Sequence, residues 1–314
     1  MTNLQNKPIT VIGGVNVDIC GTSFEQLLEG DSNPGKITTT LGGVGRNIAD
    51  NISRLGAPVR LATVLGDDSK GFHAEKSCLE LWIDMSLSRM IPGEVTSTYL
   101  CINDSDGNVK LAIADMDICR HINPEFLMER MDEINQSSLV VMDANLSEEA
   151  IACLCEHCTI PIFADPVSVK KAVRMKAHLG KIFCIKPNRP EAEVLTGVTI
   201  EDSKDLEKAA KVMLEMGVKQ VFISLGGDGV YYDNGTVHGI MPCCPGKVID
   251  TTGCGDNFMA AAVYGYHRGE SFITMARMGL TAAALCAEAK GANRADMSML
   301  LLEARMKSFG GVNL

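Results

Sequence analysis

The sequence predicts an α/β protein with a mostly parallel central sheet, helices on both of its faces, and a second, small β-sheet. Beyond residue 123, short apolar segments such as LVVMDAN and IPIFADP alternate with longer segments of helical periodicity. Strands and helices that alternate at this spacing form a parallel sheet that is covered on both faces. Residues 86–119 differ, because their short alternating segments surround an Asp-Gly turn, which is typical of an antiparallel hairpin.

Composition and charge exclude several classes of protein. The 314 residues suffice for one large domain or two ordinary ones, and the formal net charge of −10 argues against a nucleic-acid-binding or polybasic membrane surface. No uncharged apolar run approaches the ~20 residues that span a bilayer. The first residues lead into a strand without the organisation of a signal peptide. We therefore expect a cytoplasmic protein whose twelve cysteines are small, buried and reduced.

The first predicted strand spans residues 9–19 and carries polar residues at alternate positions. Asn16 and Asp18 therefore point to the same face of the strand. They form either a solvated edge or a pair of hydrogen-bonding groups for a polyhydroxy ligand.

A glycine turn precedes the first predicted helix. Gly42 and Gly43 lie in this turn, and the helix over residues 47–57 has its stop signal at Gly56. Asn47 lies in the first turn of the helix, where it either caps the helix locally or reaches into a site.

The later elements repeat the alternation of strand and helix. Further helices are expected over residues 72–81, 147–158, 168–179, 189–216 and 278–287. Ligands of such folds bind at the carboxyl ends of the strands. Polar residues and glycines gather at these ends: Asn145, Asp165, Lys186, Asn188, Glu191, Ser224 and residues 226–229.

Asn188 and Glu191 begin one of these helices and allow two interpretations. Asn188 with a proline two residues later is a well-formed helix start. The same amide and carboxylate, three residues apart, also suit a magnesium ion that keeps several of its waters.

A second glycine turn, near the carboxyl end of the chain, follows a short predicted strand at residues 248–250. Gly253 and Gly255 flank Cys254, and a helix follows Asp256. The first N–H groups of that helix and its dipole favour an anion in the turn. Asp256 is then either a helix cap or a general base beside a transferring phosphoryl group.

These motifs resemble the two signatures of the PfkB carbohydrate kinases, which have a ribokinase-like fold. GGVGRN matches the early signature and DTTGCGD the late one, and Asn16, Asp18, residues 188–191 and SLGGDGV fit between or before them in the family's order. The resemblance covers essentially the whole chain. Within the family the chain looks closest to pseudouridine kinases, through DSNPGKITTTLGGVGRNIADN, FADPVSVKK and MDANLSEEA.

The resemblance implies an architecture and an activity. It implies a single kinase domain over residues 1–314, with a β-lid formed by segments near 14–41 and 86–119. The implied enzyme is a phosphotransferase that uses ATP to phosphorylate the 5′-hydroxyl of pseudouridine. The alternatives are a family kinase for another nucleoside, or for a sugar such as ribose or fructose, and an inactive kinase-like binding protein. A homodimer is compatible with the resemblance, whereas nucleic acid and membranes are not expected partners.

The resemblance also implies roles for individual residues. Asp256 matches the catalytic base, beside an anion hole formed by Gly253, Cys254 and Gly255. The substrate contacts are Asn16, Asp18, Gly42, Gly43, Asn47, Thr98 and Asn145. The nucleotide contacts are Asn188, Ser224, Gly226 and Gly229. Asn188 and Glu191 organise Mg²⁺ through water, and Asp250 and Thr252 match a site for K⁺ or another monovalent cation.

Two questions stay open at this point. The residue that would read the base of pseudouridine is not identified, and the candidates are Ser32, Asn33, Asn145 and Lys171. Cys254 stands where many family members have alanine. It either fills that small space or is an oxidisable thiol at a helix start.

Overall fold

The computed structural model describes residues 4–309 and contains a large central sheet. Its strand order is β14-β13-β12-β11-β10-β9-β1-β4, with β12 to β4 parallel and β13 and β14 antiparallel. These strands are β1 (Ile9–Ile12), β4 (Val59–Ala62), β9 (Leu139–Asp143), β10 (Ile162–Asp165), β11 (Cys184–Ile185), β12 (Gln220–Ser224), β13 (Val230–Asp233) and β14 (His238–Met241). The predicted mostly parallel sheet is confirmed.

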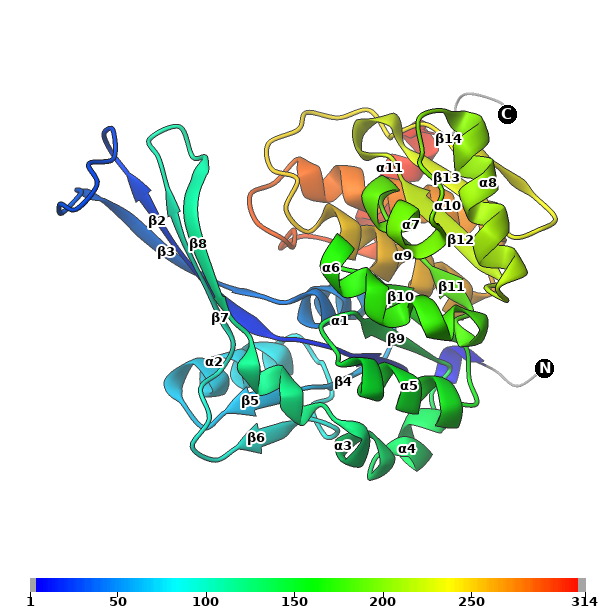
Figure 1. Ribbon diagram of the computed structural model, residues 1–314, viewed down its shortest axis with the longest axis horizontal. Coiled ribbons are helices and arrows are strands. Elements are labelled where there is room, and N and C mark those ends of the chain that lie inside the picture. Colours follow the sequence, from blue (N-terminus) through cyan, green and yellow to red (C-terminus); the bar gives the residue numbers. More distant parts are fainter. Residues whose placement is uncertain (1–3, 310–314) are drawn as a thin grey trace.

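Helices cover both faces of this sheet (Figure 1). One layer contains α1 (Val44–Arg54), α9 (Cys254–Arg268), α10 (Phe272–Ala287) and α11 (Met299–Phe309). The other contains α3 (Pro124–Met128), α4 (Met131–Asn135), α5 (Glu148–His157), α6 (Val169–Ala172), α7 (Arg189–Thr196) and α8 (Ser203–Glu215). The short 3-10 helices are η1 (Leu4–Asn6), η2 (Asp117–His121), η3 (Val173–Lys181) and η4 (Gly226–Asp228). No helix within residues 4–309 is both long and apolar enough to cross a membrane.

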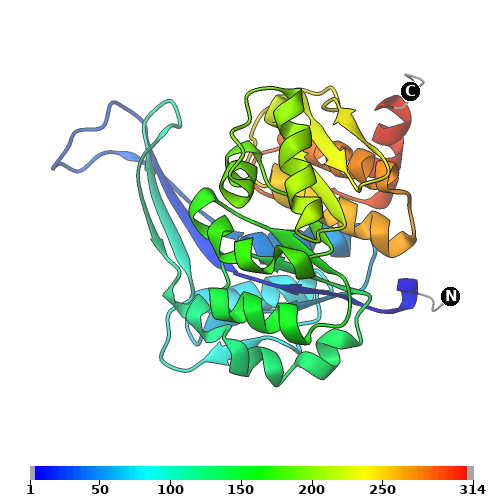
Figure 2. The same cartoon turned by 45° about the vertical axis from the view of Figure 1, so that its right-hand side comes forward.

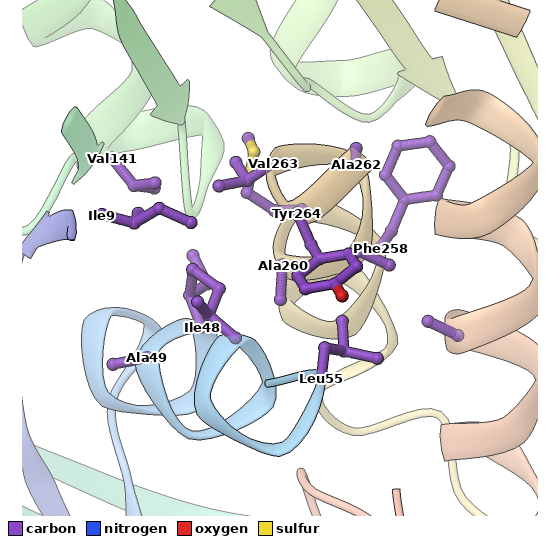
Figure 3. Packing of buried hydrophobic residues seen from close by; sticks show 14 of the residues in the cluster. Ile9, Ile48, Ala49, Leu55, Val141, Phe258, Ala260, Ala262, Val263 and Tyr264 are labelled. Carbon is purple, nitrogen blue, oxygen red and sulfur yellow. The ribbon is translucent and has the colours of Figure 1, made fainter. Parts of the chain in front are cut away.

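The hydrophobic core has two halves because successive strand residues point to opposite faces. In β9, Leu139 and Val141 belong to the half under α1 and α9, whereas Val140 and Met142 belong to the half under α5 and α8. Figure 3 shows the first half, where Ile9 of β1 and Val141 of β9 lie beside side chains of α1 and α9. All strand positions of β9 are buried, as expected of a parallel sheet covered on both sides.

A separate four-stranded sheet projects from this body, and we call it the arm sheet (Figures 1 and 2). Its order is β3-β2-β7-β8, formed by β2 (Asn16–Ser23), β3 (Gly35–Gly42), β7 (Thr98–Asn103) and β8 (Val109–Asp115). The predicted Asp-Gly hairpin joins β7 to β8, with Asp104 and Asn108 hydrogen-bonded across the turn. The expectation of a small separate sheet is therefore confirmed.

Three sequence-based boundaries were wrong. The single strand expected over residues 9–19 is two strands, because the chain leaves the central sheet after Ile12 and enters the arm sheet at Asn16. Residues 86–97 contribute no strand to the arm sheet, since β6 (Arg89–Ile91) pairs in parallel with β5 (Val64–Gly66). The helix expected over 168–179 becomes the short α6 followed by η3.

The strand expected at residues 248–250 was also wrong. The N–H groups of Ile249 and Asp250 both donate to the carbonyl of Ala287, at the carboxyl end of α10. The segment therefore packs against the end of a helix and joins no sheet. This contact brings the second glycine turn against α10.

Two of the twelve cysteines are not the reduced thiols that we expected. Cys20 and Cys101 are register partners in β2 and β7 and are joined by a disulfide, with Cα atoms 4.7 Å apart. Parallel strands place register partners on the same face, which brings these two side chains together. The other ten cysteines are free.

Candidate active site

The start of α9 is the structural centre of the candidate site. Gly253 precedes the helix with φ of 76°, in the left-handed region that favours glycine. A Cβ at this position would lie 2.1 Å from the carbonyl oxygen of Ala292, so the close approach also requires glycine. Gly255 differs, because a Cβ there would meet only the Lys186 Nζ atom, at 3.3 Å. The helix start therefore exposes backbone N–H groups beside a buried ammonium.

Asp256 lies in the first turn of α9 and is tied to α1. The Asn47 side chain donates a hydrogen bond of 2.8 Å to Asp256 Oδ2. Burial raises the pKa of Asp256 to about 7, and the negative charge of Asp165 acts in the same direction. The Asn47 hydrogen bond and the positive charge of Lys186 oppose this shift. The result is a carboxyl group that titrates close to neutral pH, as a general base does.

Lys186 and Asp165 form a buried ion pair next to this helix start. Their Nζ and Oδ2 atoms are 3.2 Å apart, and both side chains are less than 8% exposed. Burial alone would lower the pKa of Lys186, but Asp165 and Glu191 raise it, so the lysine stays charged. Lys186 is thus a fixed positive charge between Asp256 and the nucleotide-side residues described next.

Asn188 and Glu191 form a complete capping box at the start of α7. Asn188 Oδ1 accepts from the Glu191 N–H at 2.9 Å, and Glu191 Oε2 accepts from the Asn188 N–H at 2.9 Å. Burial raises the pKa of Glu191. The helix-cap interpretation therefore holds for both residues. It does not exclude a second role, because Asn188 is exposed and Glu191 faces the charge of Lys186.

A cavity of about 320 Å³ adjoins the helix start and unites residues from distant parts of the chain. Ser224, Gly226 and Gly229, which the sequence predicts as nucleotide contacts, line it together with Cys254 and Gly255. Its apolar wall was not anticipated. That wall consists of Val248, Phe258, Leu280, Ala283, Ala284 and Ala287.

Asn16 and Asp18 lie together where the arm sheet leaves the body. Asn16 Nδ2 donates to Asp18 Oδ1 at 2.5 Å, and burial raises the pKa of Asp18. Gly42 lies opposite Asn16 in β3, and a Cβ there would be 2.3 Å from Asp18 Oδ2. Gly43 has φ of 97°, and its Cβ would be 2.3 Å from the carbonyl oxygen of Gly14. These glycines therefore allow the two polar side chains to lie against the glycine turn.

Asp250 and Thr252 form a tight turn before the helix start. Asp250 Oδ1 accepts from the Thr252 N–H at 2.9 Å and Oδ2 accepts from the Gly291 N–H at 3.0 Å. Burial opposes the ionised form, but these N–H groups hold the pKa of Asp250 below its usual value. The turn thus presents an ionised carboxylate beside the segment around Gly291.

Thr98 is not brought together with the other predicted substrate contacts. It is the register partner of Val17, so it lies on the opposite face of the arm sheet from Asn16 and Asp18. Its hydroxyl accepts a hydrogen bond of 2.7 Å from Lys70 Nζ and donates to the Thr96 carbonyl.

The four candidate base readers fall into two groups. Asn145 Oδ1 accepts a hydrogen bond from Lys171 Nζ, and both residues are partly buried. Ser32 and Asn33 lie in the loop between β2 and β3, where the Asn33 side chain is bonded to Leu28 and Asp31. Asn145 and Lys171 are the pair next to the body of the protein.

Cys254 contacts a second cysteine. Its thiol donates to the carbonyl of Ala283 at 3.4 Å, and the thiol of Cys286 donates to the carbonyl of Thr252 at 3.4 Å. The hydrogen bond between the two side chains lowers the pKa of the Cys254 thiol and raises the pKa of the Cys286 thiol. Cys254 therefore does more than fill an alanine-sized space, since it joins α9 to α10.

Three buried residues of the site were missed as functional candidates or given no role. Asp165 and Lys186 were noted only as polar residues at strand ends, and Asp143 was not singled out. Asp143 accepts hydrogen bonds from the N–H groups of Gly14 and Gly45. The available signal was a charged residue at the end of an otherwise apolar strand, in LVVMD and IFAD.

The assembled geometry suits transfer of a phosphoryl group. A carboxyl group that titrates near neutral pH adjoins the start of α9 and a buried ammonium, while the Cys254 N–H donates to the Thr251 carbonyl at 3.3 Å. Such fixed donors stabilise developing negative charge without reorganisation. An adjacent cavity lined by glycines and apolar side chains suits a nucleotide.

Comparison with known proteins is consistent with this geometry. The model of the pfkB family of carbohydrate kinases matches residues 6–298. Pseudouridine kinase of Escherichia coli is 36% identical over 293 residues, which cover 93% of this chain and 94% of that protein. A solved carbohydrate kinase from Agrobacterium tumefaciens is 30% identical with a TM-score of 0.84, covering 96% of this chain and 97% of the other.

A second solved structure shows the shared fold. Arabidopsis thaliana ribokinase complexed with ribose and ATP has a TM-score of 0.85 and 24% identity, covering 96% of this chain and 99% of the other. The fold is thus ribokinase-like. With the family model matched over nearly the whole chain, the protein belongs to the pfkB family of carbohydrate kinases.

Proposed function

We propose that this kinase transfers the γ-phosphoryl group of ATP to the 5′-hydroxyl of pseudouridine, with Asp256 as the general base. The observation that carries the mechanism is the position of Asp256, which lies at the start of α9, bonded to Asn47 and next to the cavity. The choice of pseudouridine is supported by the 36% identity to pseudouridine kinase of Escherichia coli over nearly the full length of both chains.

In this proposal the residues of the helix start act on the transferred group. Asp256 takes the proton of the acceptor hydroxyl as the bond to phosphorus forms. The N–H groups of Gly253, Cys254 and Gly255 stabilise the charge on the phosphoryl oxygens. Since phosphoryl transfer has a loose transition state, positioning and charge stabilisation contribute most of the rate. Removal of one fixed donor of this kind typically costs ~10²–10³ in rate.

Lys186 adds a fixed positive charge to this anion hole. Its ammonium lies 3.3 Å from the position of a Cβ on Gly255, so it is near the phosphoryl path. It is also paired with Asp165, which holds it in place. We propose that Lys186 contacts the transferred group while Asp165 keeps the lysine oriented.

The cavity would hold the nucleotide. Ser224, Gly226 and Gly229 would border the phosphates and sugar, and the apolar wall on α10 would cover the base. Oxygen donors near Lys186 fit Mg²⁺, because Glu191 is a buried carboxylate beside the exposed amide of Asn188. When bound with ATP, Mg²⁺ neutralises charge on the phosphates. Asp250 and Thr252 would orient a monovalent cation such as K⁺ behind the helix start.

The acceptor would lie between the body and the arm sheet, which we propose to act as a lid. Asn16, Asp18 and the turn at Gly42 and Gly43 would bind the ribose hydroxyls. Asn47 would lie beside them, next to the general base Asp256. A lid excludes water, which would otherwise compete with the hydroxyl as acceptor. Asn145 and Lys171 are the pair best placed to read the uracil ring, because they lie together at the end of β9.

The alternative is a kinase of the same mechanism with another acceptor. A solved relative of 30% identity is named only as a carbohydrate kinase, which favours testing free sugars as well. An inactive binding protein is disfavoured because such a protein has no need of Asp256.

The decisive experiment is a panel of acceptors with ATP and Mg²⁺. Phosphorylation of pseudouridine, uridine, cytidine, ribose and fructose is measured by product formation at equal concentration. We expect kcat/KM to be highest for pseudouridine. A site that accepts a hydrogen bond from the free ring N1–H of pseudouridine leaves its own acceptor group unpaired when uridine is bound. A preference for a free sugar would reject pseudouridine and leave the kinase mechanism intact. Full turnover by Asp256→Asn would instead reject the mechanism.

A further inference from the structure

Asp143 ends β9 and is buried at the junction between the body and the arm sheet. It is 1% exposed, and its carboxylate accepts three backbone hydrogen bonds. Oδ1 accepts from Asn145 N–H at 2.8 Å, a local turn of its own segment. Oδ2 accepts from Gly14 N–H at 3.1 Å and Gly45 N–H at 3.0 Å, which lie 31 residues apart on two other segments. We propose that Asp143 is a positioning residue. It holds the arm sheet in a fixed position relative to the start of α1, whose Asn47 is bonded to the general base Asp256.

The two bonded segments are the ones by which the chain enters and leaves the first half of the arm sheet. Gly14 lies between β1 and β2, and Gly45 lies just after β3, at the start of α1. Their packing leaves no room for side chains, since a Cβ on Gly45 would be 2.9 Å from Gly13 Cα. A Cβ on Gly13 would lie 2.3 Å from Asp143 Oδ2 itself. The carboxylate oxygen thus fills the space between the two segments.

Both segments lead directly to functional side chains. Gly14 is followed by Asn16 and Asp18, which carry the proposed acceptor contacts on β2. Gly45 is followed by Asn47, whose side chain donates to Asp256. One oxygen of Asp143 therefore sets the distance between the residues that bind the acceptor and the base that deprotonates it. It does so without contact with the reacting atoms.

Local architecture alone does not account for this arrangement. The bond of Oδ1 to Asn145 is sufficient to shape the end of β9, as an Asp side chain commonly does in a turn. Oδ2 accepts from the two glycine N–H groups, both of which lie outside the segment of Asp143. Charged acceptors form the stronger class of hydrogen bond, which suits a contact that links three segments of the chain.

Two variants test the proposal by different routes. Asp143→Asn keeps the shape but offers one acceptor oxygen in place of two. Gly13→Ala keeps the carboxylate but places a methyl group 2.3 Å from Oδ2, which forces the carboxylate to move. The matched control is Asp233→Asn, because Asp233 is also a buried carboxylate, 6% exposed, that accepts from a backbone N–H, that of Gly235. Asp233 lies in β13, which is separated from β9 by three strands in the order of the central sheet.

The first readout is hydrogen exchange of the protein without ligands. We expect both test variants to exchange faster by about tenfold or more in peptides covering residues 14–23 and 43–50, and Asp233→Asn to match the wild type there. Unchanged exchange in these peptides in either test variant would overturn the proposal. Global acceleration of exchange in all peptides would equally overturn it, since it would show a general loss of stability.

The second readout is kinetic and rests on the proposed function. With pseudouridine as acceptor, kcat/KM for the acceptor should fall by up to ~100-fold in both variants, the scale of a 1 Å misplacement. KM for ATP should stay within about twofold of the wild type, because the cavity residues are untouched. Equal losses in KM for ATP and for the acceptor would contradict a positioning role. If the wild type uses none of the acceptor panel, the proposed function fails, while the exchange readout still decides the role of Asp143.

Discussion

At the scale of single residues, the decisive property of the site is an unusual balance of charge. The carboxyl groups of Asp165, Glu191 and Asp256 act on the ammonium of Lys186, and the charge of Asp143 acts on Asp256. Burial therefore raises the pKa of Asp256 to about 7, well above that of an ordinary aspartate. An acid of this strength in the folded protein is a base poised at neutral pH.

The raised pKa of Asp256 gives a predicted pH profile. Below about pH 7 the carboxyl group holds a proton and cannot accept that of the acceptor. We expect kcat/KM for the acceptor, at saturating ATP and Mg²⁺, to rise about tenfold per pH unit below this value and to level off above it. Asp256→Asn should lose at least ~10² of the activity and the pH dependence together. A wild-type profile that stays flat from pH 5.5 to 8 would show that Asp256 is not the base.

Single residues also show what sequence reasoning can and cannot reach. Roles for Asp256 and its glycines could be predicted because the prediction rests on neighbours in the chain. The same holds for Asn188 and Glu191, three residues apart on one helix start. Lys186 and Asp165 lie on different strands and meet only in the folded sheet. Their pairing depends on strand order, which no local pattern specifies.

At the scale of elements, the start of α9 is held against the segment around Ala292. Gly253 has a positive φ, and its backbone lies so close to that of Ala292 that a Cβ would not fit between them. Gly255, two residues later, has helical backbone and open space except for Lys186. The same motif thus contains one glycine that the fold requires and one whose open side faces Lys186 in the proposed site.

This difference predicts opposite effects of two alanine substitutions. Gly253→Ala should destabilise the protein by about 2 kcal/mol or more, because the methyl group collides with Ala292 and the backbone is strained. Gly255→Ala should change stability by less than ~0.5 kcal/mol, while it lowers kcat by obstructing the space beside Lys186. Chemical denaturation and steady-state kinetics of both variants check this. Equal stability of the two variants would contradict the assignment.

Elements with strong periodicity were predictable, whereas connections were not. The helix after β9 and the hairpin between β7 and β8 follow from patterns of spacing and turn residues. Residues 248–250 are apolar in the same way as a strand, but they bond to Ala287 at a helix end. Their partner is a carbonyl group that lies nearly forty residues further along the chain, and that proximity exists only after folding.

At the scale of the whole molecule, the arm sheet is built from two excursions of the chain. One contains β2 and β3 and the other contains β7 and β8, with β2 and β7 pairing in parallel at the centre (Figure 1). The disulfide between Cys20 and Cys101 joins these two excursions across 81 residues. Composition suggested only reduced thiols, since register partners cannot be recognised before strand pairing is known.

The disulfide predicts a dependence of stability on reductant. A cross-link over a loop of this length can stabilise a protein by roughly 4 kcal/mol through the unfolded state. We expect the midpoint of thermal unfolding to fall by at least ~3 °C on reduction, whereas a variant with both Cys20→Ser and Cys101→Ser should not respond. Titration of the unreduced, denatured wild type should count ten free thiols. Twelve free thiols, together with equal unfolding midpoints of the wild type with and without reductant, would show that the disulfide does not form.

The two-part origin of the arm sheet has a consequence for how this protein can diversify. Under the proposed roles, the residues that contact the acceptor all lie before residue 172, and residues after 185 hold the nucleotide and carry the general base. New acceptor preferences can therefore arise by variation before residue 172, while the transfer chemistry after residue 185 is inherited unchanged. The hydrogen bond from Asn47 to Asp256 is where these two independently varying parts have to remain compatible.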